Sequence, residues 1–273
     1  MKKYSIRQIA DLVEGKALIN APQNESIDEL LIDSRKIARA ASSLFFAIKG
    51  DRHNGHNFVE SCLLAGVHNF VVTGIEPEWQ NAVANFIVVE DTLAALQKLA
   101  GEHRRQFSLP VVGITGSNGK TIVKEWLFQL MRPDKNIVRS PKSYNSQTGV
   151  PLSVWQIDSD HEIALIEAGI SQPGEMEHLQ KIIQPTIGIF TNIGTAHDEH
   201  FENLSQKVRE KLQLFASNDT LIYCKDYNAV QSEISTAEFL PQKLKLFTWS
   251  KKVKADLQIG RISKGSETEI QGV

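Results

Sequence analysis

The chain has little cysteine and no excess of basic residues. Its 273 residues include only two cysteines, Cys62 and Cys224, which lie far apart and share no metal-ligand spacing. We therefore expect buried, reduced thiols in a cytoplasmic protein rather than a disulfide framework or a zinc site. Lys and Arg total 30 against 32 Asp and Glu, a formal net charge of −2. This balance gives no reason to expect nucleic acid or an anionic membrane as a partner.

Long apolar runs, repeats and targeting signals are also absent from the sequence. No run approaches the roughly 20 apolar residues of a membrane-spanning helix, so we expect no membrane insertion. The first eight residues, MKKYSIRQ, carry charge, but the apolar core of a signal peptide does not follow them. What remains is ordinary globular composition, 41% hydrophobic and 23% charged, in a chain long enough for about two domains.

The most informative stretch is VVGITGSNGKT, residues 111–121. β-Branched residues lead into a Gly-rich turn that closes with Gly-Lys-Thr, and helical spacing follows. Such a turn at a helix N-terminus presents backbone N–H groups to an anion. We expect Lys120 to reach the β- and γ-phosphates of a nucleotide and the Thr121 hydroxyl to bind Mg²⁺. The usual pattern has Gly where this chain has Ile114, so the loop is a variant. The alternative is a Gly-rich turn without a nucleotide, which the strand-turn-helix context disfavours.

Strands and helices are expected to alternate along the whole chain. A long amphipathic helix over residues 92–107 is broken by Ser108-Leu109-Pro110, where we place a domain boundary. The first domain is then small and α/β, over residues 1–108, and the second covers 109–273. In the second domain, near-continuous apolar strands separated by helices predict a parallel sheet covered on both faces.

Polar candidates follow three different strands of that sheet, at the edge where sites of parallel sheets lie. They are the loop over residues 115–120, Glu167 after the apolar strand IALI, and the stretch 192–197. Glu167 is either a Mg²⁺ ligand or a solvated strand end, and its apolar strand favours the ligand. His197 is equally well read as a surface histidine. Lys211, on an amphipathic helix, would on its own be a solvated lysine.

Several blocks of the sequence resemble those of the Mur ligases, which build the peptidoglycan precursor. Residues 113–121, GITGSNGKT, look like the ATP loop of that family. Other blocks resemble the branch that adds D-alanyl-D-alanine: Asn145 with GVPL at 149–152, IEAG at 166–169 with GEM at 174–176, and TNIGTAH at 191–197. In the first domain, similar blocks belong to the UDP-sugar domain: IDSR at 32–35, LFFAIKG at 44–50 and GHNF at 55–58. The resemblance covers about residues 27 to 224.

This resemblance implies an ATP-dependent ligase that uses Mg²⁺ and joins D-alanyl-D-alanine to UDP-N-acetylmuramoyl-tripeptide through an acyl phosphate. The implied nucleotide-binding residues are Gly116, Ser117, Asn118, Gly119, Lys120 and Thr121. The implied metal ligands are Thr121 and Glu167 for one Mg²⁺, and His197 with a carbamylated Lys211 for a second. The implied catalytic residues are Lys120, Asn145 near the γ-phosphate, His197 and Lys211. The implied contacts to the UDP part of the substrate are Ser34, Arg35, His56 and Asn57.

The resemblance also implies more protein than residues 1–273. Family members continue with an adenine site and a third domain, so we expect a fragment that binds UDP-sugar and cannot complete ligation alone. The sequences of residues 146–155 and 167–171 also resemble segments of fused enzymes in which this ligase precedes an alanine racemase. Two alternatives stay open: a related ligase that adds a single amino acid or acts on folate, and a non-catalytic binding module. A metabolite kinase is disfavoured, because no obvious lid segment is present.

Overall fold

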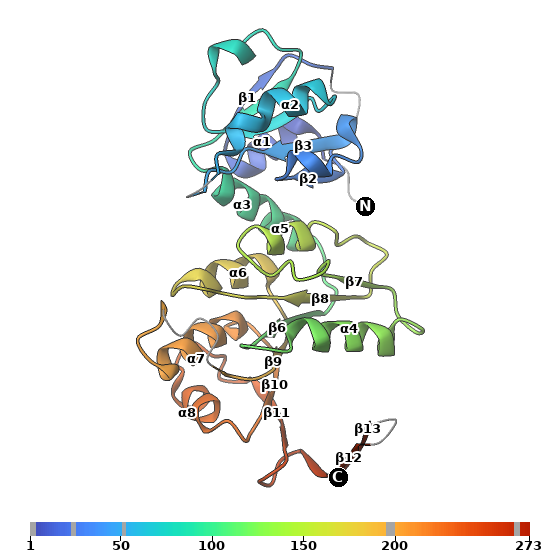
Figure 1. Ribbon diagram of the computed structural model, residues 1–273, viewed down its shortest axis with the longest axis vertical. Helices are drawn as coiled ribbons and strands as arrows, with labels where there is room; N and C mark the ends of the chain where they lie inside the picture. Colours follow the sequence, from blue (N-terminus) through green and yellow to red (C-terminus); the bar gives the residue numbers. More distant parts are fainter. Residues whose placement is uncertain (1–3, 23–25, 51–52, 195–199, 265–267) are drawn as a thin grey trace. The chain divides into compact units, whose positions relative to one another are not determined.

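The computed structural model describes residues 4–22, 26–50, 53–194, 200–264 and 268–273 (Figure 1). The chain divides into two compact units, residues 1–107 with 154–159, and residues 108–153 with 160–273. Each unit is built on its own β-sheet, and most pairs of neighbouring strands are parallel. The α/β fold with parallel sheets that the sequence predicts is confirmed. The return of residues 154–159 to the first unit was not anticipated by the single expected boundary.

The first unit holds a five-stranded sheet in the order β1-β5-β4-β3-β2. Only β1 runs antiparallel to its neighbour. The strands are β1 (Lys16–Ile19), β2 (Glu29–Leu31), β3 (Ser43–Phe46), β4 (Asn69–Val72) and β5 (Asn85–Val88). The helices are α1 (Ile6–Val13), α2 (Val59–Leu64) and α3 (Thr92–Arg104), with 3₁₀ turns at Ser34–Lys36, Ala40–Ser42, Gly55–Phe58 and Pro77–Trp79.

Local sequence explains why the helices of this unit begin and end where they do. Ser5 and Gln8 form a capping box that starts α1, and Glu14 ends the helix in a left-handed conformation, φ 57°. The buried face of α1 carries its apolar side chains, Ile6, Ile9, Ala10 and Val13. At the start of α3, the Asp91 carboxylate accepts hydrogen bonds from two backbone N–H groups of the first turn. Strands β3 and β4 are fully buried, and their aromatic side chains form the core of the unit.

An aromatic cluster joins residues 154–159 to the rest of the first unit. The Trp155 indole donates a hydrogen bond to the carbonyl of Asp28, 3.0 Å away. His103 Nε2 lies 2.8 Å from the carbonyl oxygen of Ile157, so this nitrogen carries a proton, and in the neutral ring Nδ1 accepts from the Tyr4 hydroxyl at 2.9 Å. The ring centroids of His103 and Trp155 are 4.7 Å apart. The segment is therefore held by both ring packing and directed hydrogen bonds.

The second unit holds an eight-stranded sheet in the order β13-β12-β11-β10-β9-β6-β8-β7. Its strands are parallel except for the terminal β12–β13 hairpin. The strands are β6 (Val111–Thr115), β7 (Ile137–Arg139), β8 (Ile163–Glu167), β9 (Ile187–Phe190), β10 (Thr220–Cys224), β11 (Lys245–Ser250), β12 (Leu257–Lys264) and β13 (Thr268–Gly272). The helices are α4 (Lys120–Met131), α5 (Gly149–Val154), α6 (Glu175–Ile183), α7 (Leu204–Leu212) with a 3₁₀ turn at Gln213–Phe215, and α8 (Asn228–Thr236).

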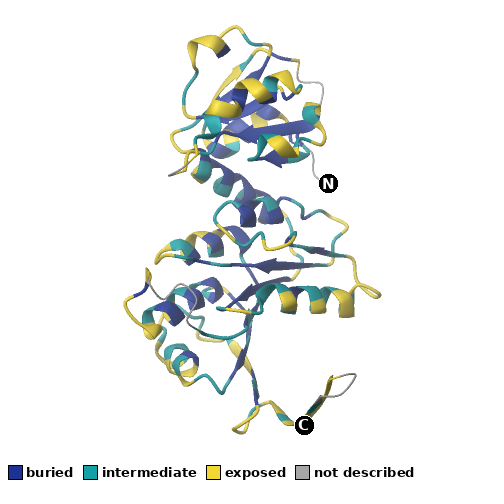
Figure 2. Cartoon of the chain, viewed as in Figure 1, coloured by how far each residue is buried: buried dark blue, intermediate teal, exposed yellow. Residues whose placement is uncertain are grey.

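Both faces of β6 are covered, which fixes the edge where the loops meet. Apolar side chains of α4 pack on Val112, Ile114 and Leu165 on one face. On the other face, a Cβ at Gly113 would stand 2.9 Å from Pro185, so only glycine fits there. Figure 2 shows the strands at the centre of each unit as buried. Because β6 lies between β8 and β9, the loops that follow these three strands meet at one edge of the sheet.

None of the helices in the described part of the chain is both long enough and apolar enough to cross a membrane.

Candidate nucleotide-binding site

The loop between β6 and α4, residues 116–119, is hydrogen-bonded to the two residues that follow β9. Gly116 and Gly119 have φ of +141° and +80°, values that glycine adopts most readily. The backbone N–H of Ser117 donates to the carbonyl of Asn192 at 2.9 Å, and the N–H of Asn118 donates to the Asn192 side-chain oxygen at 3.0 Å. The Thr191 hydroxyl donates to the Asn118 carbonyl at 2.7 Å. The loop therefore keeps its shape through contacts with a neighbouring strand.

Lys120 begins α4 and folds back over this loop. Its ammonium donates to the carbonyl of Gly116 at 2.8 Å and contacts the carbonyl of Ser117 at 3.4 Å. Burial lowers the pKa of Lys120, and the negative charge of Glu167 partly offsets that effect. A cation held at the mouth of a Gly-rich loop before a helix N-terminus is suited to binding an anion.

The side chains of Thr121, at the start of α4, and Glu167, at the end of β8, contact each other beside the loop. The Thr121 hydroxyl donates to Glu167 Oε2 at 2.9 Å. Glu167 is fully buried, and its other oxygen, Oε1, has no hydrogen-bond partner among the described residues. A buried carboxylate oxygen that accepts no hydrogen bond is costly, and hydroxyl and carboxylate oxygens are the ligands that Mg²⁺ prefers. These two residues therefore fit a metal ion, as the sequence predicts.

Lys124, one turn after Lys120, is a buried residue of this site that the sequence did not reveal. Its ammonium donates to the carbonyls of Ser140, at 2.7 Å, and of Lys142. It also lies 3.5 Å from Glu167 Oε1, within ion-pair distance. The side chain is completely buried. Its position four residues after Lys120, on the same side of a helix, was the only available signal.

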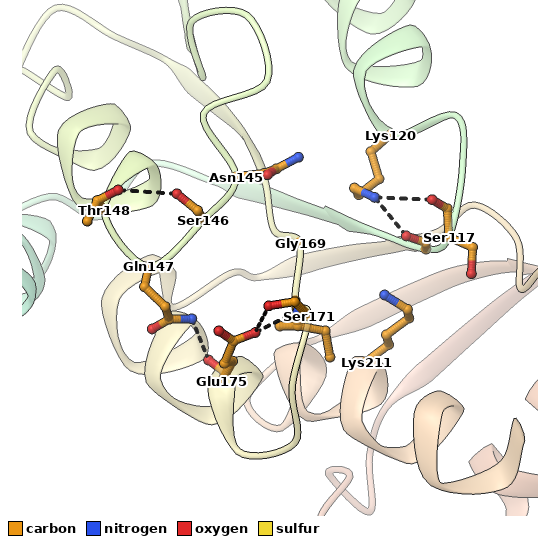
Figure 3. Close-up of a pocket in the computed structure, with 12 residues that line it drawn as sticks. Ser117, Lys120, Asn145, Ser146, Gln147, Thr148, Gly169, Ser171, Glu175 and Lys211 are labelled. Atoms are coloured by element: carbon orange, nitrogen blue, oxygen red, sulfur yellow. Dashed lines mark hydrogen bonds between the residues drawn. The ribbon is translucent and has the colours of Figure 1, made fainter. Parts of the chain in front are cut away.

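A pocket of about 320 Å³ opens in front of the loop (Figure 3). The Lys120 and Lys211 amines and the Asn145 amide point into the same space. Five of the predicted site residues thus come together here, Gly116, Ser117, Lys120, Asn145 and Lys211. The remaining lining residues are Ser146, Gln147, Thr148, Gly169, Ile170, Ser171 and Glu175.

Lys211 reaches this pocket from the buried face of α7. Burial, together with the positive charges of Lys120 and Lys207, lowers the pKa of Lys211 to about 7. Lys207 lies one turn earlier on the same helix, is also buried, and donates to the carbonyl of Gly194. The alternative stated from the sequence, that Lys211 is a solvated lysine, is therefore wrong, because the side chain is buried.

Glu175, at the first turn of α6, closes the far side of the pocket. Its carboxylate accepts hydrogen bonds from the backbone N–H groups of Ser171, at 2.6 Å, and Gln172, at 2.9 Å. Gln147 donates to the backbone carbonyl of Glu175 at 3.0 Å. The carboxylate thus holds the loop after β8 in place. The GEM block at 174–176 marked this segment in the sequence, but the role of Glu175 did not follow from it.

Ser34 and Arg35 lie in the first unit, in the 3₁₀ turn after β2. Asp33 caps this turn and also pairs with Arg35 through both carboxylate oxygens, at 2.8 and 2.9 Å. Arg35 holds the pKa of Asp33 at about 2. The guanidinium is exposed, so it has donors left for an anion.

His56 and Asn57 lie in the same unit, in the 3₁₀ turn that precedes α2. His56 Nε2 accepts from the backbone N–H of Thr73 at 3.0 Å, and Nδ1 donates to the Asn54 side chain at 2.9 Å. Burial lowers the pKa of His56, which favours this neutral ring. Both ring nitrogens are thus engaged within the protein, and His56 shapes its loop.

His197 lies outside the described residues. Within the part of the chain that the structure describes, no group of three or more His, Cys, Asp or Glu side chains could hold a metal ion by itself. A metal at this site would therefore depend on the mixed set of Thr121 and Glu167, completed by a bound phosphate or water.

Family models match both units of the chain. Residues 114–271 match the Mur ligase middle domain, and residues 26–104 match the Mur ligase family, catalytic domain. Among curated relatives, UDP-N-acetylmuramoyl-tripeptide–D-alanyl-D-alanine ligase from Bacillus subtilis is 32% identical over 86% of this chain and 51% of its own length. The enzyme of that name from Synechocystis is 34% identical over 71% of this chain and 43% of its own length. The chain spans about half the length of the curated relatives it matches.

Solved structures show the same architecture. MurF from Acinetobacter baumannii superposes on the whole chain with a TM-score of 0.88 at 24% identity, over 58% of that protein. MurF ligase from Thermotoga maritima, solved in complex with ADP, superposes on 89% of the chain and 55% of that protein, with a TM-score of 0.76 at 25% identity.

Proposed function

Because the chain belongs to the Mur ligase family, we propose that it carries the UDP-substrate unit and the phosphate-binding unit of an ATP-dependent amide ligase. The reaction joins D-alanyl-D-alanine to UDP-N-acetylmuramoyl-tripeptide through an acyl phosphate, in peptidoglycan precursor synthesis. The names of the relatives from Bacillus subtilis and Synechocystis support this choice of substrates. Two buried free cysteines and the use of ATP support a cytoplasmic location.

The observation that carries the proposal is that a Gly-rich loop of the phosphate-binding type lies beside a buried carboxylate oxygen that accepts no hydrogen bond from the described residues. The loop over residues 116–119 leads into the N-terminus of α4, where the N–H groups of the first helical turn and the Lys120 ammonium can serve the nucleotide phosphates. Lys120 gives up its bonds to loop carbonyls when an anion takes their place. Asn145 reaches the same space with an amide that can donate to the phosphate being transferred.

Thr121 and Glu167 are the residues that would hold a Mg²⁺ ion. Their oxygens are already adjacent, and Glu167 Oε1 is buried without a hydrogen-bond partner in the described part of the chain. Bound there, Mg²⁺ would neutralise charge on the phosphate oxygens during transfer. The carboxylate is fixed before any metal arrives, because its second oxygen accepts from the Thr121 hydroxyl.

Lys211 supports the proposal as the lysine that becomes carbamylated. The neutral amine would attack CO₂, which forms an N–C bond and releases one proton to solvent. The product is a carboxylate-like anion in place of a cation that Lys120 and Lys207 disfavour. His197 would share the second metal with this group.

The first unit would bind the UDP part of the substrate. Arg35 presents an exposed guanidinium, whose planar donors suit phosphate oxygens, and Ser34 precedes it in the same turn. Asn57 follows His56 in the second turn of this unit. We assign His56 to the shape of that turn, since its ring nitrogens bond Asn54 and Thr73.

Calorimetry on residues 1–273 tests the proposal directly. UDP-N-acetylmuramoyl-tripeptide is expected to bind, and Arg35→Ala to weaken it, whereas Lys98→Ala, which removes an exposed ion pair with Glu14, leaves binding unchanged. ADP with Mg²⁺ is expected to bind the wild type and not Lys120→Ala. Absence of both interactions in the wild-type chain would refute the proposal.

The acceptor is tested by release of phosphate. With ATP and the UDP-tripeptide present, the complete ligase is expected to release phosphate when D-alanyl-D-alanine is added and not when single amino acids are added. A preference for a single amino acid would assign the chain to another ligase of the family. Binding without turnover by residues 1–273 alone agrees with the length of the relatives, about half of which this chain spans.

A further inference from the structure

Lys124 is a fully buried cation that the reaction proposed above does not use. Lysine is almost never fully buried unless its charge is compensated. Here the ammonium has four polar neighbours: the carbonyls of Ser140 and Lys142, Glu167 Oε1 at 3.5 Å, and Glu125 Oε1 at 3.4 Å. The three N–H donors of the ammonium thus face four acceptors, two from the loop after β7, one from β8 and one from α4 itself.

These contacts connect three parts of the nucleotide site. Lys124 and Thr121 belong to α4, Ser140 and Lys142 to the loop after β7, and Glu167 to the end of β8. Ser140 strengthens the link, because its hydroxyl accepts from the Glu167 backbone N–H at 3.2 Å. One buried side chain therefore fixes a metal-binding carboxylate relative to a loop.

That loop leads directly into the pocket. Lys142 has φ 49°, a left-handed conformation in which the Lys124 bond to its carbonyl helps to hold it. Three residues later, Asn145 lines the pocket, and its carbonyl accepts from the N–H of Gly169 at 2.8 Å. A displacement at Lys142 would thus be passed on to Asn145.

Stability alone does not explain a lysine in this position. Replacing a buried ion pair such as Lys124–Glu167 as a whole with apolar side chains is often neutral or stabilising, whereas methionine at residue 124 alone would leave Glu167 buried without its counter-ion. We attribute the buried ammonium instead to its effect on Glu167, whose carboxylate it holds in one position. Groups that orient metal ligands commonly affect metal affinity although they never touch the ion.

We propose that Lys124 is a positioning residue, which holds Glu167 and the loop over residues 140–145 in the arrangement that a magnesium nucleotide requires. This inference rests on the nucleotide site proposed above. Lys124 touches neither metal nor phosphate in this role. Its ammonium also serves as the counter-ion of Glu167 while no metal is bound.

The test compares Lys124→Met with Lys135→Met in the chain of residues 1–273. Lys135 is a matched control, because it follows α4, pairs with Glu162 at 2.7 Å and is half-exposed. ADP affinity is measured by calorimetry with Mg²⁺ and with EDTA, and the ratio of the two dissociation constants is the magnesium enhancement. Lys124→Met is expected to reduce this enhancement about 10- to 100-fold. Lys135→Met is expected to leave it unchanged.

Hydrogen exchange tests the loop without any ligand. Amides of residues 141–147 are expected to exchange faster in Lys124→Met and at the wild-type rate in Lys135→Met. If Lys124→Met does not fold, the double variant Lys124→Met/Glu167→Gln removes both buried charges. It is then compared with Glu167→Gln alone, and faster exchange in the double variant only is the expected result.

The outcomes separate the two proposals. A wild type that does not bind ADP refutes the nucleotide site, while the exchange rates still report on Lys124. A wild type that binds ADP, with a folded Lys124→Met that keeps both the magnesium enhancement and the slow exchange, overturns the inference. An affinity loss that is equal with Mg²⁺ and with EDTA also overturns it, because general damage to the site would lower both alike.

Discussion

Gly116 and Gly119 lie in the same loop, and alanine at each position should have very different effects. Both have positive φ, +141° and +80°, so each substitution adds backbone strain. At Gly116, an added Cβ would stand 2.1 Å from the Thr191 hydroxyl oxygen and 2.9 and 3.0 Å from the backbone of Asn192. At Gly119, nothing lies within 4 Å of the added Cβ. The pair therefore separates strain from collision within one loop.

The structure sets the size of each effect. For Gly116→Ala, an unfavourable φ costs about 1–3 kcal/mol and forced displacement of packed backbone about another 1–3, a total of about 2–6 kcal/mol. For Gly119→Ala, left-handed strain costs about 1–2 kcal/mol, and the stiffer unfolded chain returns about 0.4–1, which leaves about 1 kcal/mol. The larger cost arises because the collision at residue 116 is with Thr191 and Asn192, which follow β9 and hold the loop in place.

Urea denaturation of the ligand-free chain measures the difference in stability. Hydrogen exchange at residues 111–131 then shows where the loss occurs, since the disturbance should concentrate around the loop and the start of α4. ADP titration completes the comparison, because Gly116→Ala displaces the loop that leads into the N-terminus of α4 and Lys120. Equal unfolding midpoints for the two variants, or wild-type exchange in Gly116→Ala, would refute this account of the loop.

Three further changes have defined outcomes. Thr121→Val removes the hydroxyl that Glu167 accepts from, so the magnesium enhancement of ADP binding should fall about tenfold, measured by calorimetry with and without Mg²⁺. The pKa of folded His56 lies below its ordinary 6.5, so the unfolded chain binds that proton more readily and stability falls as the pH drops below 6.5. His56→Phe should flatten this part of the profile, and urea unfolding at neutral and mildly acidic pH measures it. Asp91→Ala removes two hydrogen bonds from the start of α3 and should lower the free energy of unfolding by about 1 kcal/mol.

The sequence predicts the fold well where the spacing of apolar residues clearly matches either a strand or a helix. The apolar strand that ends at Glu167 has a clear pattern and appears where it was expected, and the helix Glu175–Ile183 has an equally clear pattern. Strand β11 was missed, because its sequence KLFTWS alternates weakly and its first three residues are exposed. Strand β1 was missed for the same reason, since none of its residues is buried. β1 and the first half of β11 are exposed, so their pairing depends on neighbouring strands that no local pattern reports.

The site shows the same contrast between local and distant information. Gly116–Thr121 could be proposed from sequence as a phosphate-binding loop, because that function requires a continuous stretch of chain with fixed spacing. Lys124 could not, since a lysine on an amphipathic helix is normally solvated, and only the carbonyls of Ser140 and Lys142 make its burial tolerable. The same holds for His56, whose ring is occupied by Asn54 and Thr73. Contacts between distant residues decide both roles.

The charges around the pocket explain why it should favour anions. Lys120 and Lys207 both act on Lys211, and burial adds to their effect, so positive charge at Lys211 is disfavoured. Like charges held together in a poorly solvated site cost free energy, and an anion that enters removes part of that cost. Phosphate groups at the loop and a carbamate on Lys211 would each do so from a different side. Repulsion among these lysines would therefore add to the affinity of the proposed site for anions. Lys124, whose charge is compensated by Glu167 and the loop carbonyls, would instead fix the geometry of that site.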